Sequence, residues 1–125
     1  VATTSGASVQ RPTNTPDGSE ADAIGIAVAA LRRDDSLRAV QLAESALHTH
    51  PRSPSLYRIL GTAHYRRGDY EASRDALQQS RDLDNRQALT YFLLGATLEK
   101  LGETEAAGQH FERARQLDPR YALNP

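Results

Sequence analysis

The chain has 125 residues, and its 15 basic and 16 acidic side chains give a net charge of −1 when the histidines are neutral. This length fits one domain, and a charge so close to zero excludes a bulk electrostatic attraction to nucleic acid or to an anionic membrane. Cysteine is absent, which excludes disulfides. The apolar run that includes residues 27–31 is far too short for a transmembrane helix.

Amino-acid usage favours a bacterial source. Lys100 is the only lysine, alanine is abundant, and methionine, cysteine and tryptophan are absent, which is typical of GC-rich coding sequence. No intact signal peptide is recognisable, because no apolar segment stands near the start. Cytoplasmic and periplasmic locations both stay open, and the start at Val1 is compatible with a fragment or with a processed protein.

The segment at positions 1–18 predicts no regular structure. It consists mainly of Thr, Ser, Gly and Pro without apolar periodicity, and such a composition buries too little surface to offset the entropy of the chain. We therefore expect a disordered tail or linker at residues 1–18 and one domain at residues 19–125. Ser19 and Asp22 resemble a capping box, so order is expected to begin there.

Two helices are predicted next. Apolar residues recur at helical spacing over residues 23–31. Asp34 and Asp35 interrupt this pattern, and both are good N-caps for a second helix. That helix is expected to end at His50 and Pro51, because the residue before a proline avoids the helical region.

The middle of the chain predicts a second pair of helices. Ser53 and Pro54 are a capping serine and a proline in the first turn of a helix. Gly68 permits a left-handed turn at the end of this helix, and Asp69 is expected to cap the next one. We predict that this next helix covers about residues 70–83.

The last third repeats the arrangement. Helices are predicted at about residues 86–101 and 104–117, with Gly102 in the turn between them and Asp118–Pro119 at the end. The whole chain thus predicts six helices of about 14 residues with short turns, which is typical of antiparallel helical hairpins in series.

The second and third hairpins are copies of one another at one constant spacing. The matched pairs are Tyr57 and Tyr91, Leu60–Gly61 and Leu94–Gly95, and Gly68 and Gly102. The first hairpin is a degenerate copy, with Ile26–Ala27 at the Leu-Gly position and with Pro51 one such spacing before Asn85. A period of about 34 residues indicates a repeat architecture.

The period and these residues resemble the tetratricopeptide repeat. The third hairpin matches that pattern well, and the second departs from it at His64, Ser73, Ser80 and Asn85. The resemblance covers about residues 19–121 and implies an all-α fold. This fold would be an α-solenoid of three antiparallel helix-turn-helix repeats with six helices in a right-handed superhelical stack. The repeats would span about residues 20–53, 54–87 and 88–121.

Small and large residues at fixed positions of the repeat are expected to have packing roles, because small residues let two helices approach and large ones fill the space beside them. The small residues are Ala27, Ala39, Gly61, Ser73, Gly95 and Ala107, and the large ones are Tyr57, Leu77, Tyr91 and Phe111. We do not count these residues as binding residues.

In solenoids of this kind the first helix of each repeat lines a concave groove. The candidate groove residues are Ile24, Val28, Leu31 and Arg32, then Arg58, Ile59, Thr62, Tyr65 and Arg66, then Leu89, Phe92, Leu93 and Ala96. Ile59, Phe92 and Leu93 would form an exposed apolar patch there, and such a patch usually marks a binding surface. The alternatives are packing against the neighbouring repeat and a dimer or crystal contact.

Some members of this family bind acidic C-terminal tails through a clamp of Lys, Asn and Arg. The corresponding positions here are all apolar, and they are Ile24, Val28, Ile59, Leu89 and Leu93. This disfavours the tail-binding activity. Arg32, Arg58 and Arg66 are candidates for pairing with an acidic group of a peptide, with a solvated helix face as the alternative.

No catalytic, metal or cofactor pattern is present in the sequence. His48 and His50 are two positions apart and point to different sides of a helix. HExxH and CxxC motifs are absent, and no strand precedes Gly61 or Gly68 as a phosphate loop would require. We therefore expect no enzymatic activity, no metal and no cofactor.

The sequence predicts a non-catalytic interaction module that binds a protein or peptide segment in the groove as a scaffold or adaptor. No nucleic acid and no membrane insertion are expected. Only residues 120–125 follow Asp118–Pro119, too few for a capping helix, so we expect either that the chain continues or that another chain covers this end. Two alternatives stay open: a self-assembly module that dimerises or stacks through this end, and an accessory domain of a larger enzyme or envelope protein.

Overall fold

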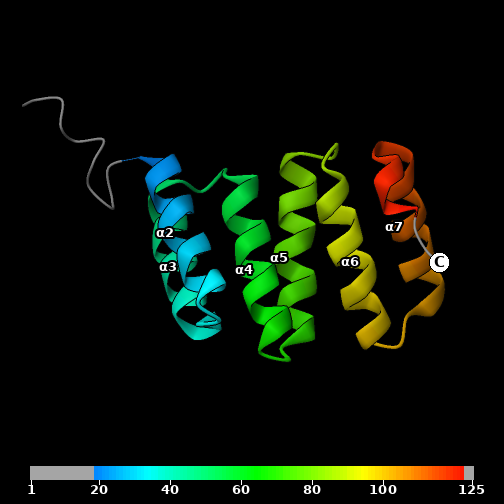
Figure 1. The fold of residues 1–125 in the computed structure, drawn as a ribbon, viewed down its shortest axis with the longest axis horizontal. Coiled ribbons are helices and arrows are strands. Elements are labelled where there is room, and N and C mark those ends of the chain that lie inside the picture. Colours follow the sequence, from blue (N-terminus) through cyan, green and yellow to red (C-terminus); the bar gives the residue numbers. More distant parts are fainter. Residues whose placement is uncertain (1–18, 123–125) are drawn as a thin grey trace, which may run out of the picture.

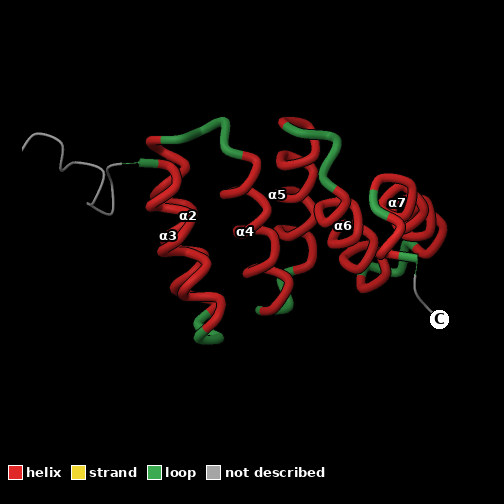
Figure 2. The backbone as a smooth tube through the Cα atoms, turned by 45° about the horizontal axis from the view of Figure 1, so that its top comes forward, coloured by secondary structure: helices red, strands yellow, loops and turns green. Residues whose placement is uncertain are grey.

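The computed structural model describes residues 19–122, which form six α-helices and a short 3-10 helix and contain no strand. The helices are α2 (Glu20–Arg32), α3 (Ser36–Thr49), α4 (Pro54–Arg66), α5 (Tyr70–Leu83), α6 (Ala88–Lys100), α7 (Thr104–Leu117) and η2 (Pro119–Tyr121). The three helical hairpins α2–α3, α4–α5 and α6–α7 follow one another in chain order along the longest axis of the molecule (Figures 1 and 2). The predicted all-α solenoid is confirmed. The tail predicted at residues 1–18 lies outside the described residues.

Three helices begin at the caps that the sequence predicts. The Ser19 hydroxyl accepts a hydrogen bond from the backbone N–H of Asp22 at 3.0 Å, and the Asp35 carboxylate accepts one from the N–H of Arg38 at 3.1 Å. The Ser53 hydroxyl likewise accepts from the N–H of Leu56 at 3.2 Å. Each cap satisfies one of the N–H groups that a helix leaves unpaired at its start.

One predicted helix cap and one predicted helix start are wrong. Asp69 precedes α5, but its side chain makes no capping hydrogen bond, and its carboxylate lies 3.7 Å from Nε of Arg67 instead. Helix α6 begins at Ala88, slightly later than the expected start at position 86. The reason is Asp84, whose carboxylate accepts from the backbone N–H of Arg86 at 3.1 Å and from the side-chain amide of Gln87 at 2.9 Å, and so holds both residues in a turn.

The turn inside each hairpin has a residue with left-handed backbone conformation at the same position of the repeat. Gly68 and Gly102 both have φ of 83°, as predicted for Gly68. In the first repeat the corresponding residue is Asp34, with φ of 61°, and aspartate is one of the few residues that tolerate this region. Asp34 is therefore the turn residue of its hairpin, and only Asp35 caps the helix that follows.

Close approach of paired helices at glycine is confirmed. A Cβ atom added to Gly61 would lie 2.6 Å from Cγ of Leu77, and one added to Gly95 would lie 2.7 Å from Cε1 of Phe111. Both distances are far below a van der Waals contact. The large residue of one helix thus occupies the space that the missing side chain of the other leaves.

The two interfaces between repeats differ in chemistry. The interface between the first and second repeats is apolar and is formed by a buried cluster of Ala, Val, Ile and Leu side chains, among them Val40, Ile59 and Leu60. The interface between α5 and α6 instead contains buried hydroxyls. Ser73 lies 3.2 Å from Thr97, and Ser80 lies 3.5 Å from Thr90.

None of the helices between residues 19 and 122 is both long and apolar enough to cross a lipid bilayer.

Candidate functional site

The predicted groove residues lie on α2, α4 and α6, the first helices of the three hairpins, and α4 contacts both of the others. Three classes of exposure separate these residues. Leu89 and Phe92 are exposed at 39% and 37%, and Arg32 and Arg66 are also exposed. The half-buried residues are Ile24, Val28, Leu31, Arg58, Thr62, Tyr65, Leu93 and Ala96.

Ile59 is the one predicted groove residue that is buried. Its side chain is only 4% exposed and belongs to the apolar cluster between the first and second repeats. Packing against the neighbouring repeat, the alternative stated above, is therefore the role of Ile59. Ile24, Val28 and Leu31 also pack against this cluster, so α2 offers less free apolar surface than its sequence suggests.

The exposed apolar surface is concentrated on α6. The ring of Phe92 lies 5.5 Å from the ring of Phe111 on α7 and 5.3 Å from the ring of Tyr121 in η2, centroid to centroid. Both rings contact Phe92, and more than a third of its surface is still accessible. Leu89, one turn before it on α6, is equally exposed.

Tyr121 was not predicted as part of this surface. The residues after Asp118–Pro119 were expected to be too few to cover the end of the solenoid, but Pro119–Tyr121 form η2, which packs against α7 and places Tyr121 on Phe92. Such a short helix covers the end only in part. An aromatic residue two positions after Pro119 was the signal in the sequence that could have indicated this contact.

Arg58 and Arg66 occupy different environments. Burial lowers the pKa of the Arg58 guanidinium, while Tyr121 and Asp84 act in the opposite direction, and arginine stays charged at neutral pH. Arg66 donates from Nη1 to the backbone carbonyl of Leu31 at 2.8 Å, and this carbonyl at the end of α2 also accepts from the backbone N–H of Asp34 at 3.0 Å. Arg66 therefore connects two repeats, whereas Arg58 is a half-buried cation beside the aromatic surface.

Two further predicted residues are partly committed to contacts within the fold. The Thr62 hydroxyl donates to the carbonyl of Arg58 in its own helix at 2.9 Å. The ring of Tyr65 contacts the ring of Tyr70 edge to face, with centroids 5.4 Å apart. Tyr65 remains half-exposed, so one side of its ring is available.

Within residues 19–122 no group of three or more His, Asp or Glu side chains is placed to hold a metal ion. The histidines are dispersed. His64 lies 3.9 Å from the carboxylate of Asp69, and Nδ1 of His110 lies 2.9 Å from the carbonyl of Ala106 in its own helix.

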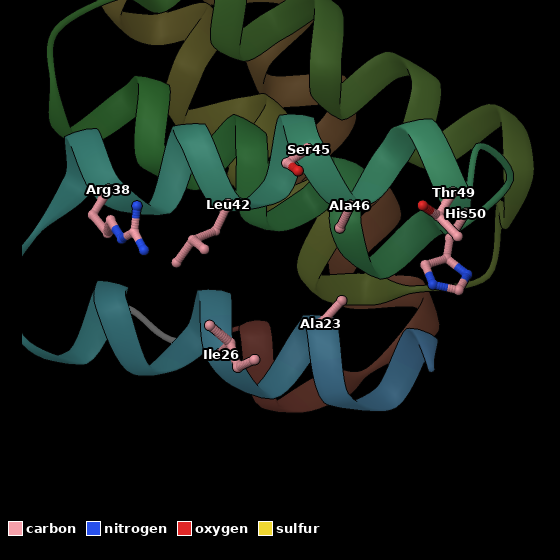
Figure 3. Close-up of a pocket in the computed structure, with 8 residues that line it drawn as sticks. All are labelled: Ala23, Ile26, Arg38, Leu42, Ser45, Ala46, Thr49 and His50. Atoms are coloured by element: carbon pink, nitrogen blue, oxygen red, sulfur yellow. The ribbon is translucent and has the colours of Figure 1, made fainter. Parts of the chain in front are cut away.

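The sequence did not predict a cavity of about 470 Å³ between α2 and α3. The side chains of Ala23 and Ile26 on α2 and of Leu42 and Ala46 on α3 point into the space between the two helices, whereas Ser45 and Thr49 lie against α3 (Figure 3). The lining residues are Ala23, Ile26, Arg38, Leu42, Ser45, Ala46, Thr49 and His50. None of them belongs to the predicted groove. Ala23 could have indicated this cavity from the sequence, because it is a small residue at the position where the other repeats have Tyr57 and Tyr91.

Comparison with known families and structures agrees with this architecture. A family model described as tetratricopeptide repeat matches residues 24–88 and again residues 60–122. No curated protein matches the chain in sequence.

Several solved structures share the fold. A Thermobaculum terrenum O-GlcNAc transferase mutant is 25% identical with a TM-score of 0.76 over 79% of this chain and 19% of the transferase. MamA is 22% identical with a TM-score of 0.78 over 89% of this chain and 64% of MamA. The second repeat domain of Spaghetti (RPAP3), bound to the HSP90 peptide SRMEEVD, is 16% identical with a TM-score of 0.77 over 87% and 99% of the two chains. The chain thus spans a fifth of the transferase and about two thirds of MamA.

Proposed function

The chain belongs to the tetratricopeptide repeat family, and we propose that it is a non-catalytic module that binds a protein or peptide segment along the first helices of its repeats. The observation that carries this proposal is the exposed surface of Leu89 and Phe92 beside the half-buried Arg58. The role is that of a scaffold or adaptor, with no cofactor and no nucleic acid.

The chemistry of this surface suits a peptide. Phe92 is already held by Phe111 and Tyr121, so little side-chain entropy is lost when a partner covers it. Aromatic and arginine side chains are the residue types that carry most of the energy in protein interfaces. Arg58 is partly shielded from water, which strengthens a hydrogen bond to a carboxylate or carbonyl of the partner.

The Spaghetti structure supports a peptide ligand, because a domain of the same fold holds the HSP90 peptide SRMEEVD. At 16% identity this likeness concerns the fold alone. The apolar residues Leu89 and Leu93 stand where a carboxylate clamp would need polar groups. We therefore propose a partner segment with apolar anchors and an acidic or polar group near Arg58, in place of an acidic C-terminal tail.

Selection from a phage-displayed library of random peptides tests the proposal. Peptides that bind the wild-type chain should lose at least about tenfold in affinity in Phe92→Ala, and also in Arg58→Gln and Tyr65→Ala. Leu37→Ala is the matched control, because Leu37 is a large apolar side chain, 49% exposed, on a second helix of a hairpin. Unchanged affinity in the first three variants would rule out this surface.

Self-association through the last hairpin is a second candidate, and the exposure of Leu89 and Phe92 near that end favours it. Sedimentation equilibrium over a wide concentration range separates the two functions. A monomer at all concentrations excludes self-association, and a dimer that Phe92→Ala dissociates would replace the peptide proposal. Coverage of only 19% of the transferase is also compatible with a repeat domain inside a larger protein.

A further inference from the structure

The cavity between α2 and α3 lies in the first hairpin, away from the surface around Phe92. All eight lining residues come from α2, α3 and the cap that follows α3 (Figure 3). Its volume of about 470 Å³ is in the range of pockets that hold ligands. Any binding here is therefore independent of the function proposed above.

The third repeat shows what fills the corresponding space. Tyr91 corresponds to Ala23 in the repeat, two periods later in the sequence. The ring of Tyr91 lies 6.1 Å from the ring of His110, and its centroid lies 5.8 Å from Cζ of Arg113. His110 and Arg113 in turn occupy the positions of Leu42 and Ser45, which both line the cavity.

The cavity thus exists because the first repeat lacks the aromatic ring that the third repeat carries. Tyr57 stands at the same position in the second repeat. In the third repeat the phenol of Tyr91 also donates a hydrogen bond to the carbonyl of Asn85 at 3.1 Å, in the turn before α6. An aromatic side chain that enters the cavity from outside would lie between α2 and α3 as Tyr91 lies between α6 and α7.

The lining matches an aromatic side chain in chemistry as well. Ala23, Ile26, Leu42 and Ala46 supply apolar surface, and Ser45 and Thr49 supply hydroxyls. Arg38 and His50 stand at opposite ends of the cavity in Figure 3. None of the eight residues is acidic, so a ligand with a carboxylate beside its ring is favoured over one with a cation.

Two occupants from the chain itself fit poorly. Residues 1–18 contain no aromatic residue, and their largest apolar side chains are valines. A second copy could offer Phe92, but Phe111 and Tyr121 already pack on that ring. A contact between Phe92 of one copy and the cavity of another would be head to tail, and it would produce a ring or a filament instead of a closed two-fold dimer.

We propose that the cavity between α2 and α3 is a second binding site, which receives a tyrosine or phenylalanine side chain from a segment of a different protein. The inserted ring takes the place that Tyr91 has in the third repeat. This site lies outside the groove that the first helices of the repeats are proposed to form.

The test uses the full chain and N-acetyl-L-tyrosinamide as a probe, followed by methyl NMR. We expect saturable shifts at the methyl groups of Ala23, Ile26 and Ala46, and at least tenfold weaker binding of N-acetyl-L-aspartamide, which has no ring. Ala23→Tyr supplies the missing ring and should abolish the shifts. Ala21→Tyr is the matched control, because Ala21 is exposed on the same helix and does not line the cavity.

A folding defect in Ala23→Tyr does not weaken the test, because Ser45→Tyr covers the cavity from an exposed position and should also reduce binding at least tenfold. Phage-displayed peptides that bind the wild-type chain but not Ala23→Tyr should all contain Tyr or Phe. The proposal is overturned by shifts that do not saturate, by equal binding in both cavity variants, or by selected peptides without an aromatic residue. Self-association that Ala23→Tyr abolishes would instead assign the cavity to a second copy.

Discussion

The hydroxyl oxygens of Ser73 and Thr97 lie 3.2 Å apart, fully buried between α5 and α6. Each hydroxyl also reaches a backbone carbonyl at 2.8 Å, that of Gly61 for Ser73 and that of Leu93 for Thr97. Each hydroxyl has one proton to donate, so only two of these three contacts can be hydrogen bonds at the same time. Because the carbonyl bonds are the shorter ones, the contact between the hydroxyls is mainly one of two acceptors, and it adds little attraction of its own.

This relationship predicts weak coupling between the two side chains. Ser73→Ala should lower the free energy of unfolding by about 0.5–1.5 kcal/mol, the usual net value of one hydrogen bond. Thr97→Val keeps the shape of the side chain and should cost less, because the hydroxyl of Thr97 bonds within its own helix.

A double-mutant cycle by urea unfolding measures the coupling, which we expect below about 0.5 kcal/mol. A coupling above about 1 kcal/mol would show that the hydroxyls bond directly to each other across the interface. Ser80→Ala is a useful comparison, since Ser80 donates to the carbonyl of Pro54 at 2.8 Å and lies farther, 3.5 Å, from Thr90.

Alanine substitution should separate packing glycines from neutral ones. In Gly61→Ala the new methyl would lie 2.6 Å from Cγ of the fully buried Leu77 and 3.2 Å from the backbone carbonyl of Ser73, so we expect a loss of about 1–3 kcal/mol. Gly95→Ala should cost less, because the ring that it meets, Phe111, is only half-buried and can move.

Gly108→Ala and Gly25→Ala are the matched controls. Both glycines lie inside helices, and an added Cβ would find nothing within 4 Å. Alanine is the better helix former, so both variants should gain up to about 1 kcal/mol. Equal effects at all four positions in thermal or urea unfolding would contradict the packing role of Gly61 and Gly95.

Local signals in the sequence predicted most of the helices. The bounds of α5 and α7 agree with the expected ones, because each helix has a clear signal at both ends. A turn with glycine, at Gly68 or Gly102, precedes the helix, and Asn85 or Pro119 follows it. Ser53 caps α4 as expected, since a capping bond involves residues only three positions apart. The start of α6 was wrong because the competing side chain, Asp84, binds two residues that precede the helix.

The candidate site was less accessible to sequence reasoning. Ile59 was predicted to belong to an exposed apolar patch in the groove, but its burial depends on how closely the first repeat approaches, which no pattern within α4 reveals. Tyr121 lies beyond the last α-helix of the repeat, and its contact with Phe92 joins residues that are far apart in the sequence. The cavity beside Ala23 depends on a ring that is missing, and only comparison between repeats makes that absence visible.

Tyr121→Ala should destabilise the last repeat. The substitution removes the ring that packs on Phe92 at 5.3 Å and uncovers more of an already exposed apolar side chain. We expect a loss of about 1 kcal/mol in the free energy of unfolding, the value typical of an aromatic pair. Tyr121→Phe keeps the ring and is the control. If both variants unfold like the wild type, η2 contributes no stability and the end of the solenoid is uncovered.

Arg120→Gln should change the acid titration of one carboxylate. Arg120 donates from Nη2 to Oδ2 of Asp118 at 2.7 Å and from Nε to Oδ1 at 3.0 Å, and these hydrogen bonds are the main reason why the pKa of Asp118 lies below its ordinary value. A folded-state pKa below the unfolded one means that the ionised carboxylate stabilises the fold. That contribution is complete above the unfolded pKa of about 3.9 and is lost as the pH falls through the folded-state pKa.

The variant removes the guanidinium charge and its paired hydrogen bonds to the carboxylate, and it keeps the backbone N–H of residue 120, which donates to Asp118 at 3.0 Å. The pKa of Asp118 should therefore rise toward the ordinary value without reaching it, and the chain should lose less stability on acidification. Asp84 is the internal control, because its pKa is lowered mainly by the Gln87 side chain and the Arg86 N–H, which the substitution leaves in place. NMR titration of the carboxyl carbons measures both groups in one sample. A shift of equal size at Asp84, or none at Asp118, would show that Arg120 does not hold this carboxylate in solution.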